Sequence, residues 1–237
     1  MNVLELFAGA GGGILGSQLL GHRTVCAVEY DRYAASVLMQ RQNDGILPPF
    51  PIWDEVRTFR GEPWRGIVDC VSGGFPCQDI SSAGKGAGIE GEKSGLWSEM
   101  FRIVSEIRPS FVFVENSDRL VSRGLGRVLG DLASIGYDSE WMRLRASECG
   151  ANHVRPRLWV LAHANSAQLE RGSLSSGIYE EDTNFSYTCW GKDKPGVDRM
   201  ANALAHRVDR LKAIGNGQVP IVAATAFQEL MFRIKHT

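Results

Sequence analysis

The sequence predicts an α/β protein with a doubly wound, mostly parallel sheet and a very small inserted segment. Short β-branched runs alternate with segments of helical period, and a glycine cluster, LELFAGAGGG, directly follows the first apolar run. Both features are typical of folds that bind a ligand at the carboxyl edge of a parallel sheet. A chain of 237 residues, 43% of them hydrophobic, is long enough to bury a substantial core.

The expected elements alternate along the chain. Asp31 has the side chain of a helix N-cap and precedes one of the helices. A short strand-like stretch precedes Asp54. Strands are predicted at 2–7, 24–28, 67–72, 111–115, 137–145 and 158–162, and helices at 14–20, 31–42, 96–107, 124–135 and 219–232.

One region interrupts this alternation and sets the domain boundaries. Residues 164–196 are rich in Ser, Gly, Asn and charge and have no sustained period, so they predict an inserted loop or very small subdomain. We therefore expect a first catalytic part at 1–163, the insert at 164–196, and a segment at 197–237 that returns to the first part.

Bulk properties indicate a cytoplasmic protein without a metal site. No apolar run approaches the length of a membrane span, and the N-terminus MNVLELFAGAG lacks the features of a signal peptide. The five cysteines have no paired spacing, which argues against disulfides or zinc and leaves room for one reactive thiol. The net charge of −1 means that any nucleic-acid contact must come from a local basic face.

The glycine cluster and two acidic residues predict a pocket for an adenosyl group. Gly9 and Gly11 allow close backbone approach to a ligand, although Ile14 breaks the dinucleotide fingerprint and a tight turn without a ligand is the alternative. Glu29 ends the second strand, where a carboxylate can accept hydrogen bonds from both hydroxyls of a ribose. Asp54 is placed to accept from an adenine amino group; taken alone, it reads as a helix N-cap before 55–57.

Cys77 is the candidate nucleophile. It follows a strand in the stretch GGFPCQDISSAGKGAG, where Pro76 makes the approach to the thiol rigid. The glycine- and serine-rich stretch after it, beginning with Gln78 and including Ser81, predicts a mobile lid over a substrate. A lone cysteine is otherwise most often a small buried hydrophobe.

A carboxylate and two arginines are expected near that thiol. Glu115 ends the strand FVFVE, where partial burial tends to raise the pKa of a carboxyl and suits it to proton transfer; the alternative is a helix cap. Arg155 and Arg157 precede the last strand and are placed to bind a phosphate or a base carbonyl, with solvated strand surface as the alternative.

Six segments run in order along nearly the whole chain outside 164–196: LELFAGAGGG, AVEYD, GGFPCQDISSAGKGAG, FVFVENSD, GANHVRPRLWVLA and AIGNGQVP. Together, and in this order, they closely resemble the DNA (cytosine-5)-methyltransferases. The resemblance is closest to compact phage- and prophage-type members.

The resemblance implies a Rossmann-like class I fold, S-adenosylmethionine as cofactor and double-stranded DNA as substrate. It implies that Cys77 adds to C6 of a flipped cytosine, that Glu115 contacts N3 and the exocyclic amine, and that Arg155 and Arg157 hold the base carbonyl and phosphates. It also places six residues at the cofactor: Phe7, Gly9, Gly11, Glu29, Asp54 and Asn216.

Three departures from the family pattern stand out. Ser117 and His153 replace the usual Val and Gln, and only packing changes are expected from the first. The third is the region for target recognition, which is only about 35 residues long. So small a region indicates a short target sequence, loose specificity, or a partner subunit or dimer.

Two other functions stay open at this point. A tRNA cytosine-5 methyltransferase uses the same scaffold, and comparing methyl incorporation into DNA and tRNA separates the two. A non-catalytic DNA-binding or regulatory homologue would keep the fold without methyl transfer, but intact Cys77, Glu115, Arg155 and Arg157 argue against it.

Overall fold

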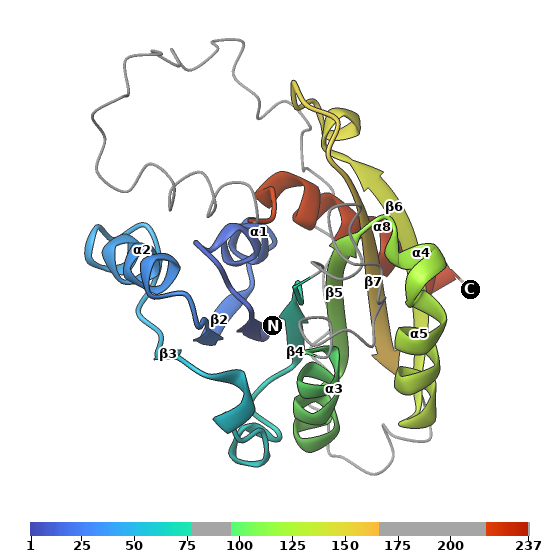
Figure 1. Cartoon of the computed structure of the whole chain (residues 1–237), viewed down its shortest axis with the longest axis horizontal. Coiled ribbons are helices and arrows are strands. Elements are labelled where there is room, and N and C mark those ends of the chain that lie inside the picture. The colour runs from blue at the N-terminus through green and yellow to red at the C-terminus, as the bar shows by residue number, and fades with distance from the viewer. Residues whose placement is uncertain (77–95, 166–216, 237) are drawn as a thin grey trace.

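The computed structural model describes residues 1–76, 96–165 and 217–236, and within them a single seven-stranded sheet (Figure 1). The strands are β1 (Asn2–Leu6), β2 (Arg23–Val28), β3 (Ile52–Trp53), β4 (Cys70–Gly73), β5 (Phe111–Ser117), β6 (Tyr137–Arg145) and β7 (Pro156–Ala164). Their order across the sheet is β3-β2-β1-β4-β5-β7-β6.

The sheet is mostly parallel, as the sequence predicts. The five strands from β3 to β5 pair in parallel, whereas β7 runs antiparallel to both β5 and β6. The chain moves outward from β1 through β2 to β3 and then returns to β4 on the other side of β1. The strand order therefore reverses between β1 and β4, which is where open α/β sheets bind ligands.

The helices occupy positions close to the predicted ones. Asp31 caps the helix that follows it, because its carboxylate accepts hydrogen bonds from the Tyr33 and Ala34 amides. The α-helices are α1 (Gly12–Leu19), α2 (Arg32–Asn43), α3 (Leu96–Ile107), α4 (Leu120–Arg123), α5 (Leu125–Ser134) and α8 (Pro220–His236), and short 3-10 turns cover Val56–Thr58, Glu62–Trp64 and Ala146–Cys149.

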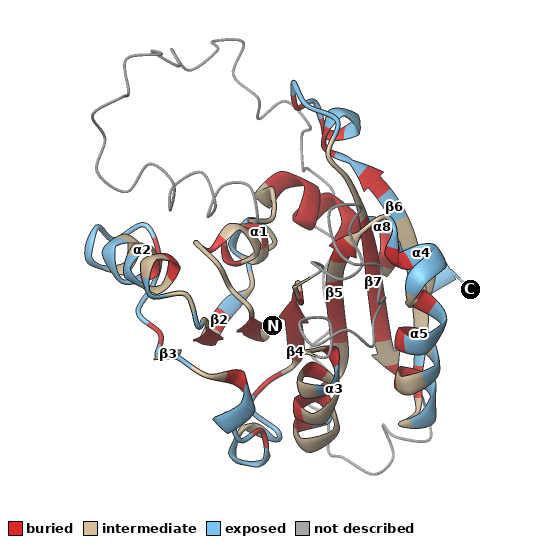
Figure 2. Ribbon diagram, viewed as in Figure 1, coloured by how far each residue is buried: buried red, intermediate tan, exposed pale blue. Residues whose placement is uncertain are grey.

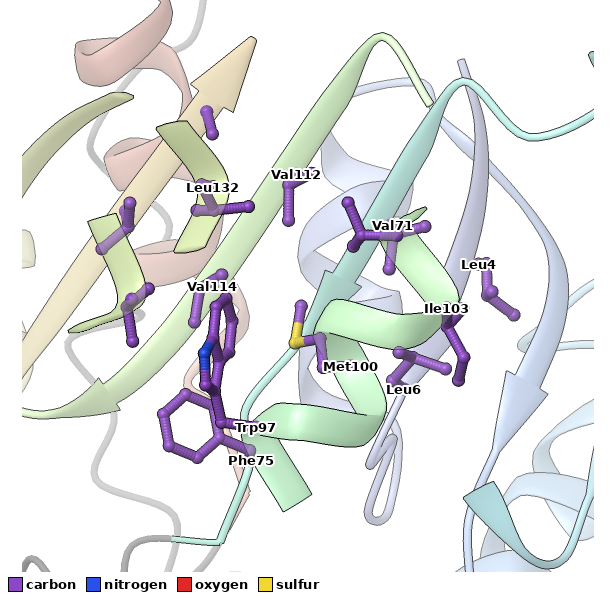
Figure 3. Packing of buried hydrophobic residues seen from close by; sticks show 14 of the residues in the cluster. Leu4, Leu6, Val71, Phe75, Trp97, Met100, Ile103, Val112, Val114 and Leu132 are labelled. Atoms are coloured by element: carbon purple, nitrogen blue, oxygen red, sulfur yellow. The ribbon is translucent and has the colours of Figure 1, made fainter. Parts of the chain in front are cut away.

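One face of the sheet is covered by α3 and α5 (Figures 1 and 2). Helix α3 buries Trp97, Met100 and Ile103 against the strands, because apolar residues recur along it at helical spacing (Figure 3). The Trp97 indole also donates to Asp131 Oδ2 of α5 at 2.8 Å, which joins the two helices. This packing forms the larger part of the hydrophobic core.

The opposite face is covered by α1 and α8, which approach each other closely. A β-carbon on Gly16 of α1 would lie 2.9 Å from the Pro220 carbonyl oxygen and 3.0 Å from the Ala223 β-carbon of α8. In the same layer, Val3 of β1 shares a buried cluster with Phe227 of α8. The last helix therefore returns to the first strand, as the sequence predicts.

The predicted boundaries differ most for three strands, β4, β5 and β7. β4 begins at Cys70 rather than at 67, because the Ile67 amide closes a turn onto the Trp64 carbonyl and Ile67 is exposed. β5 and β7 are longer than predicted because they pair antiparallel from Phe111 with His163 to Ser117 with Arg157. β7 therefore includes Ala164, the first residue of the predicted insert, and the insert from 166 onward lies outside the described residues.

In the part of the chain that the structure describes, no helix is both long enough and apolar enough to cross a membrane.

Candidate active site at the carboxyl ends of β1, β4 and β5

Two loops leave the carboxyl ends of the neighbouring strands β1 and β4, where the strand order reverses. Residues 7–11 follow β1 and residues 74–76 follow β4. Leu6 pairs with Gly73, so the two loops start at the same level of the sheet. Their position at the reversal of strand order makes them the candidate ligand site.

The loop after β1 is a tight turn held by its own backbone. Phe7, Gly9 and Gly11 have φ values of 54°, 56° and 88°, a region that glycine adopts freely and phenylalanine rarely does. The Gly11 amide donates to the Ala8 carbonyl at 3.0 Å, and Gly11 is the N-cap of α1. The predicted turn is confirmed; contact of its residues with a cofactor stays a prediction.

Glu29 is fixed against this turn from the end of β2. One carboxylate oxygen accepts from the Gly9 amide at 2.6 Å and the other from the Asp31 amide at 2.6 Å. Both donors are backbone amides, so the local fold sets the position of the carboxylate. The acidic side chain therefore lies beside the glycine turn, where the sequence predicts a ribose-binding carboxylate.

Asp54 lies exposed at the end of β3, beside the backbone of Glu29. The Glu29 amide donates to the Trp53 carbonyl at 2.8 Å, which aligns the ends of β2 and β3. The alternative interpretation of Asp54 as a helix cap is wrong, because the cap of the turn at Val56–Thr58 is Glu55, whose carboxylate accepts from the Arg57 amide. Asp54 has the open position that a ligand-binding acceptor needs.

The chain leading to Cys77 is held firmly at its start. The buried Asn116 side chain donates from Nδ2 to the Phe75 carbonyl at 3.1 Å, and the Phe75 ring packs against Trp97 with their centroids 5.6 Å apart. Pro76 is the last described residue before the gap. The predicted roles of Cys77, Gln78 and Ser81 concern residues that lie outside the described ranges.

Glu115 forms an ion pair with Arg157 beside that same segment. Arg157 Nε lies 2.8 Å from Glu115 Oε1, and the side chains are only 24% and 12% exposed. The other oxygen, Oε2, lies 2.6 Å from the point that a β-carbon on Gly74 would occupy. Glu115 is thus a member of β5 facing the loop after β4, and not a helix cap.

Burial is the largest influence on the pKa of the Glu115 carboxyl. Removal from water raises the pKa of Glu115 above its ordinary value, while the positive charges of Arg157 and Arg155 oppose the rise. The direction agrees with the prediction from sequence. A carboxyl with a raised pKa holds its proton to higher pH and is suited to donate it to a substrate.

Arg155 connects the site to the start of α8. Its Nη2 donates to the Gly217 carbonyl at 2.6 Å, and its backbone φ of 34° directs the chain into β7. The positive charge also acts on Glu115. The predicted contacts of Arg155 and Arg157 with a base or a phosphate stay predictions; in this structure both arginines serve the site by binding protein groups.

The residues after Asn216 lie against the amino end of α1. A β-carbon on Gly12 would collide with the Gln218 carbonyl oxygen, and one on Gly13 would lie 2.7 Å from Gln218 Oε1. Asn216 itself lies outside the described residues. Gln218, two residues further on, packs against Gly12 and Gly13 at the amino end of α1, and the contact of Asn216 with a cofactor stays a prediction.

The described cysteines are poor nucleophiles. Cys26, Cys70 and Cys149 are buried and free of disulfides. Burial raises the pKa of Cys26 to about 11, and it raises the pKa values of Cys70 and Cys149 as well. A reactive thiol in this chain therefore falls to Cys77 or Cys189, both outside the described residues.

Sequence reasoning missed three residues that build the site. Asn116 anchors Phe75, Gln218 reaches between α1 and Gly74, and Glu5 lies buried beneath the turn. Asn116 and Gln218 are inside quoted motifs without an assigned role. Glu5 was detectable as a single charged residue in the apolar strand NVLEL.

The fold and this site identify the class of the protein. The chain belongs to the C-5 cytosine-specific DNA methylase family, whose model matches residues 1–210. The match confirms the family that the six sequence segments resemble.

Two relatives illustrate the family at the level of sequence. The type II methyltransferase M.Eco47II of Escherichia coli is 36% identical over 201 residues, which cover 81% of this chain and 45% of that protein. M.CviJI of Paramecium bursaria Chlorella virus IL3A is 35% identical over 161 residues, covering 67% and 42%. The chain thus spans less than half the length of either relative.

Solved structures share the fold. The Entamoeba histolytica methyltransferase EhMeth superposes with a TM-score of 0.59 at 15% identity, covering 70% of this chain and 53% of that one. A prophage-encoded protein of E. coli superposes with a TM-score of 0.56 at 24% identity, covering 71% and 48%. These likenesses support the Rossmann-like class of the sheet.

Proposed function

We propose that this chain is a DNA cytosine-5 methyltransferase that uses S-adenosylmethionine. Membership of the C-5 cytosine-specific DNA methylase family supports the reaction type. The observation that carries the proposal is the buried Glu115–Arg157 pair next to Gly74, three residues before Cys77. The pair supports a role for Glu115 as the proton donor next to the segment that leads to Cys77.

The chain's own residues then account for the activation of cytosine. The Cys77 thiolate adds to C6 of the base while the protonated Glu115 donates to N3, so that electrons from the 5,6 bond become available at C5. Arg157 holds Oε1 of Glu115 and leaves Oε2 on the side of Gly74. After methyl transfer, water takes up the C5 proton and the C6–S bond breaks to release the Cys77 thiolate, which restores the aromatic ring; the Glu115 carboxylate takes its proton back from N3.

The residues around the glycine turn fit the cofactor. The Glu29 carboxylate lies beside the glycine turn, where it would accept from the ribose hydroxyls, and exposed Asp54 would accept from the adenine amino group. A β-carbon on Gly9 would meet no described atom within 4 Å, so there is open space above the turn. When bound, S-adenosylmethionine supplies the methyl group as an electrophile.

DNA recognition is assigned to the insert at 164–196. The target base is flipped out of the duplex, because C5 and C6 are inaccessible within it. A segment of about 35 residues suits a short site, or one read with the help of a second subunit. The protein would act in the cytoplasm of a bacterial or phage-infected cell.

The test is transfer of tritiated methyl from S-adenosylmethionine to unmethylated phage DNA and, separately, to bulk tRNA. We expect label in DNA with the wild-type chain and none with Cys77→Ala, whose fold is checked by circular dichroism. Label in tRNA alone would mean that tRNA, and not DNA, is the substrate. No label in either nucleic acid would favour a non-catalytic DNA-binding role. Equal labelling by Cys77→Ala would overturn the assigned nucleophile.

A further inference from the structure

Gln218 lies between Gly13, in the first turn of α1, and Gly74, in the loop after β4. Its Oε1 is 2.7 Å from the point where a β-carbon on Gly13 would stand, and its Nε2 is 3.3 Å from the corresponding point on Gly74. A larger residue at position 13 has no room while Gln218 keeps this rotamer, and one at position 74 would meet Glu115 Oε2 at 2.6 Å. One amide therefore extends from the amino end of α1 to the loop that precedes Cys77.

The oxygen of this amide needs a hydrogen-bond donor. Gln218 Oε1 is shielded from solvent, and the described residues supply no hydrogen bond to it. A buried acceptor without a partner destabilises the folded state, because it has lost its hydrogen bonds to water. Glu5 Oε2 lies 3.5 Å from the same point beside Gly13, so the two oxygens are at most about 6 Å apart, a gap that one bridging water spans.

Glu5 can supply that donor only in its protonated form. The side chain is buried, and Ser17 Oγ donates to Oε1 at 2.7 Å, which leaves Oε2 on the side of Gly13. Burial raises the pKa of Glu5, although hydrogen bonds from Ser17 and Ser72 oppose the rise. A cavity of about 10 Å³ is lined by Ser17 and Ser72, which both hydrogen-bond to Glu5, and by Gln218, and it has room for roughly one water.

The opposite end of the amide then points toward the reaction site. With Oε1 held on the side of Glu5, Nε2 lies on the side of Glu115. Nε2 and Glu115 Oε2 are both within 3.3 Å of one point beside Gly74, so they are at most about 6 Å apart, a gap that one bridging water spans. Arg157 holds Oε1 of the same carboxylate.

We propose that Gln218 is a positioning residue that links two buried carboxyls, Glu5 beneath the glycine turn and Glu115 at the reaction site. The protonated Glu5 fixes the direction of the amide, and the amide donates toward Glu115. The amide and Arg157 thus support one oxygen each of the carboxylate that remains after Glu115 gives up its proton. The catalytic part of this inference rests on the proposed function, whereas the coupling of the two carboxyls does not.

The experiment follows the carboxyl carbons of glutamate by ¹³C NMR over a pH titration of the full chain. Glu115→Gln and Glu5→Gln assign the two signals. Gln218→Met keeps the length of the side chain and removes the amide, so we expect the pKa of Glu115 to rise by about one unit. Glu5→Met removes the donor to the amide and should raise the pKa of Glu115 in the same direction.

Glu5→Gln is the matched control, because its amide still donates to Gln218 Oε1. It should leave the titration of Glu115 at its wild-type midpoint. The proposal is overturned if Gln218→Met leaves that midpoint unchanged, or if Glu5→Gln and Glu5→Met shift it equally. Should either Met variant fail to fold, the other still decides the question. Methyl transfer by the wild type is measured in a separate experiment. If no transfer is found, the proposed function is wrong, whereas the coupling of the two carboxyls is still tested by the NMR titration.

Discussion

Arg157 Nε lies 2.8 Å from Glu115 Oε1, and this ion pair joins the antiparallel strand β7 to the parallel strand β5. The reversed direction of β7 is what makes the pair: residues at the amino end of β7 meet the carboxyl end of β5. The arginine therefore reaches the edge where the parallel strands end. The antiparallel strand has a direct role in the site.

Loss of this arginine should leave a buried carboxylate without its partner. We expect Arg157→Gln to lower the free energy of unfolding by about 2 kcal/mol at pH 8 and by less at pH 6, because a lower pH favours the protonated, uncharged form of Glu115. Urea unfolding at the two pH values measures the difference. Arg57→Gln is the control, since its pair with Glu55 is 3.6 Å long and exposed and should change stability by under about 0.5 kcal/mol.

Glu5 gives stability a pH dependence of definite sign. Its folded pKa lies above 4.5, so the folded state binds more protons than the unfolded state between 4.5 and the raised value, and stability falls as pH rises through that window. We expect Glu5→Gln to remove this loss of stability. The difference in free energy of unfolding between the variant and the wild type should be largest at the highest pH measured. Glu229→Gln, on the exposed side of α8, should show no such trend. A gain for Glu5→Gln that is equal at pH 4 and pH 8 would contradict the assignment.

The contact between α1 and the residues before α8 depends on a missing side chain. Gly12→Ala would push a β-carbon into the Gln218 carbonyl, and we expect a loss of about 2 kcal/mol in thermal or urea unfolding. Gly130→Ala is the matched substitution in α5, where a β-carbon would meet no described atom within 4 Å. Because alanine favours helix over glycine, this variant should gain about 0.5–1 kcal/mol.

Glu29 should contribute to cofactor affinity. Glu29→Gln removes the negative charge that would accept two ribose hydroxyls while keeping one oxygen for the backbone, so we expect weaker binding of S-adenosylmethionine by about tenfold or more. Isothermal titration calorimetry on the folded variant measures it. Glu55→Gln, from the adjacent turn after β3, should bind as the wild type does.

Much of the fold follows from local pattern, and the exceptions have physical reasons. The apolar spacing of Trp97, Met100 and Ile103 predicts α3 correctly, and Asp31 marks the start of α2. The start of β4 was predicted too early because Ile67 looks like a strand residue, yet it is held in a turn by Trp64. The full length of β7 could not be predicted, because it depends on pairing with β5 across the sheet.

The residue types of the site could be predicted from the sequence, but most of the contacts between them could not. Glu29 and Glu115 could be placed because strand-end carboxylates gather at one edge of a parallel sheet. Their partners could not: the Gly9 amide, Arg157 and the loop at Gly74 come from distant parts of the chain. The role of Gln218 could not be predicted from the sequence, because it depends on Gly13 and Gly74 lying on either side of the side chain in the folded protein.

The most direct test of the central claim is bisulfite sequencing of plasmid DNA from cells that express the chain, in wild-type and Cys77→Ala forms, in a host lacking cytosine-5 methylation. The account predicts protected cytosines with the wild type and none with the variant. Protection at one short motif would mean that the chain reads sequence by itself, and scattered protection would mean loose specificity or a missing subunit. Plasmid with no protected cytosine, from cells containing folded wild-type protein, would contradict the proposal that this chain methylates DNA.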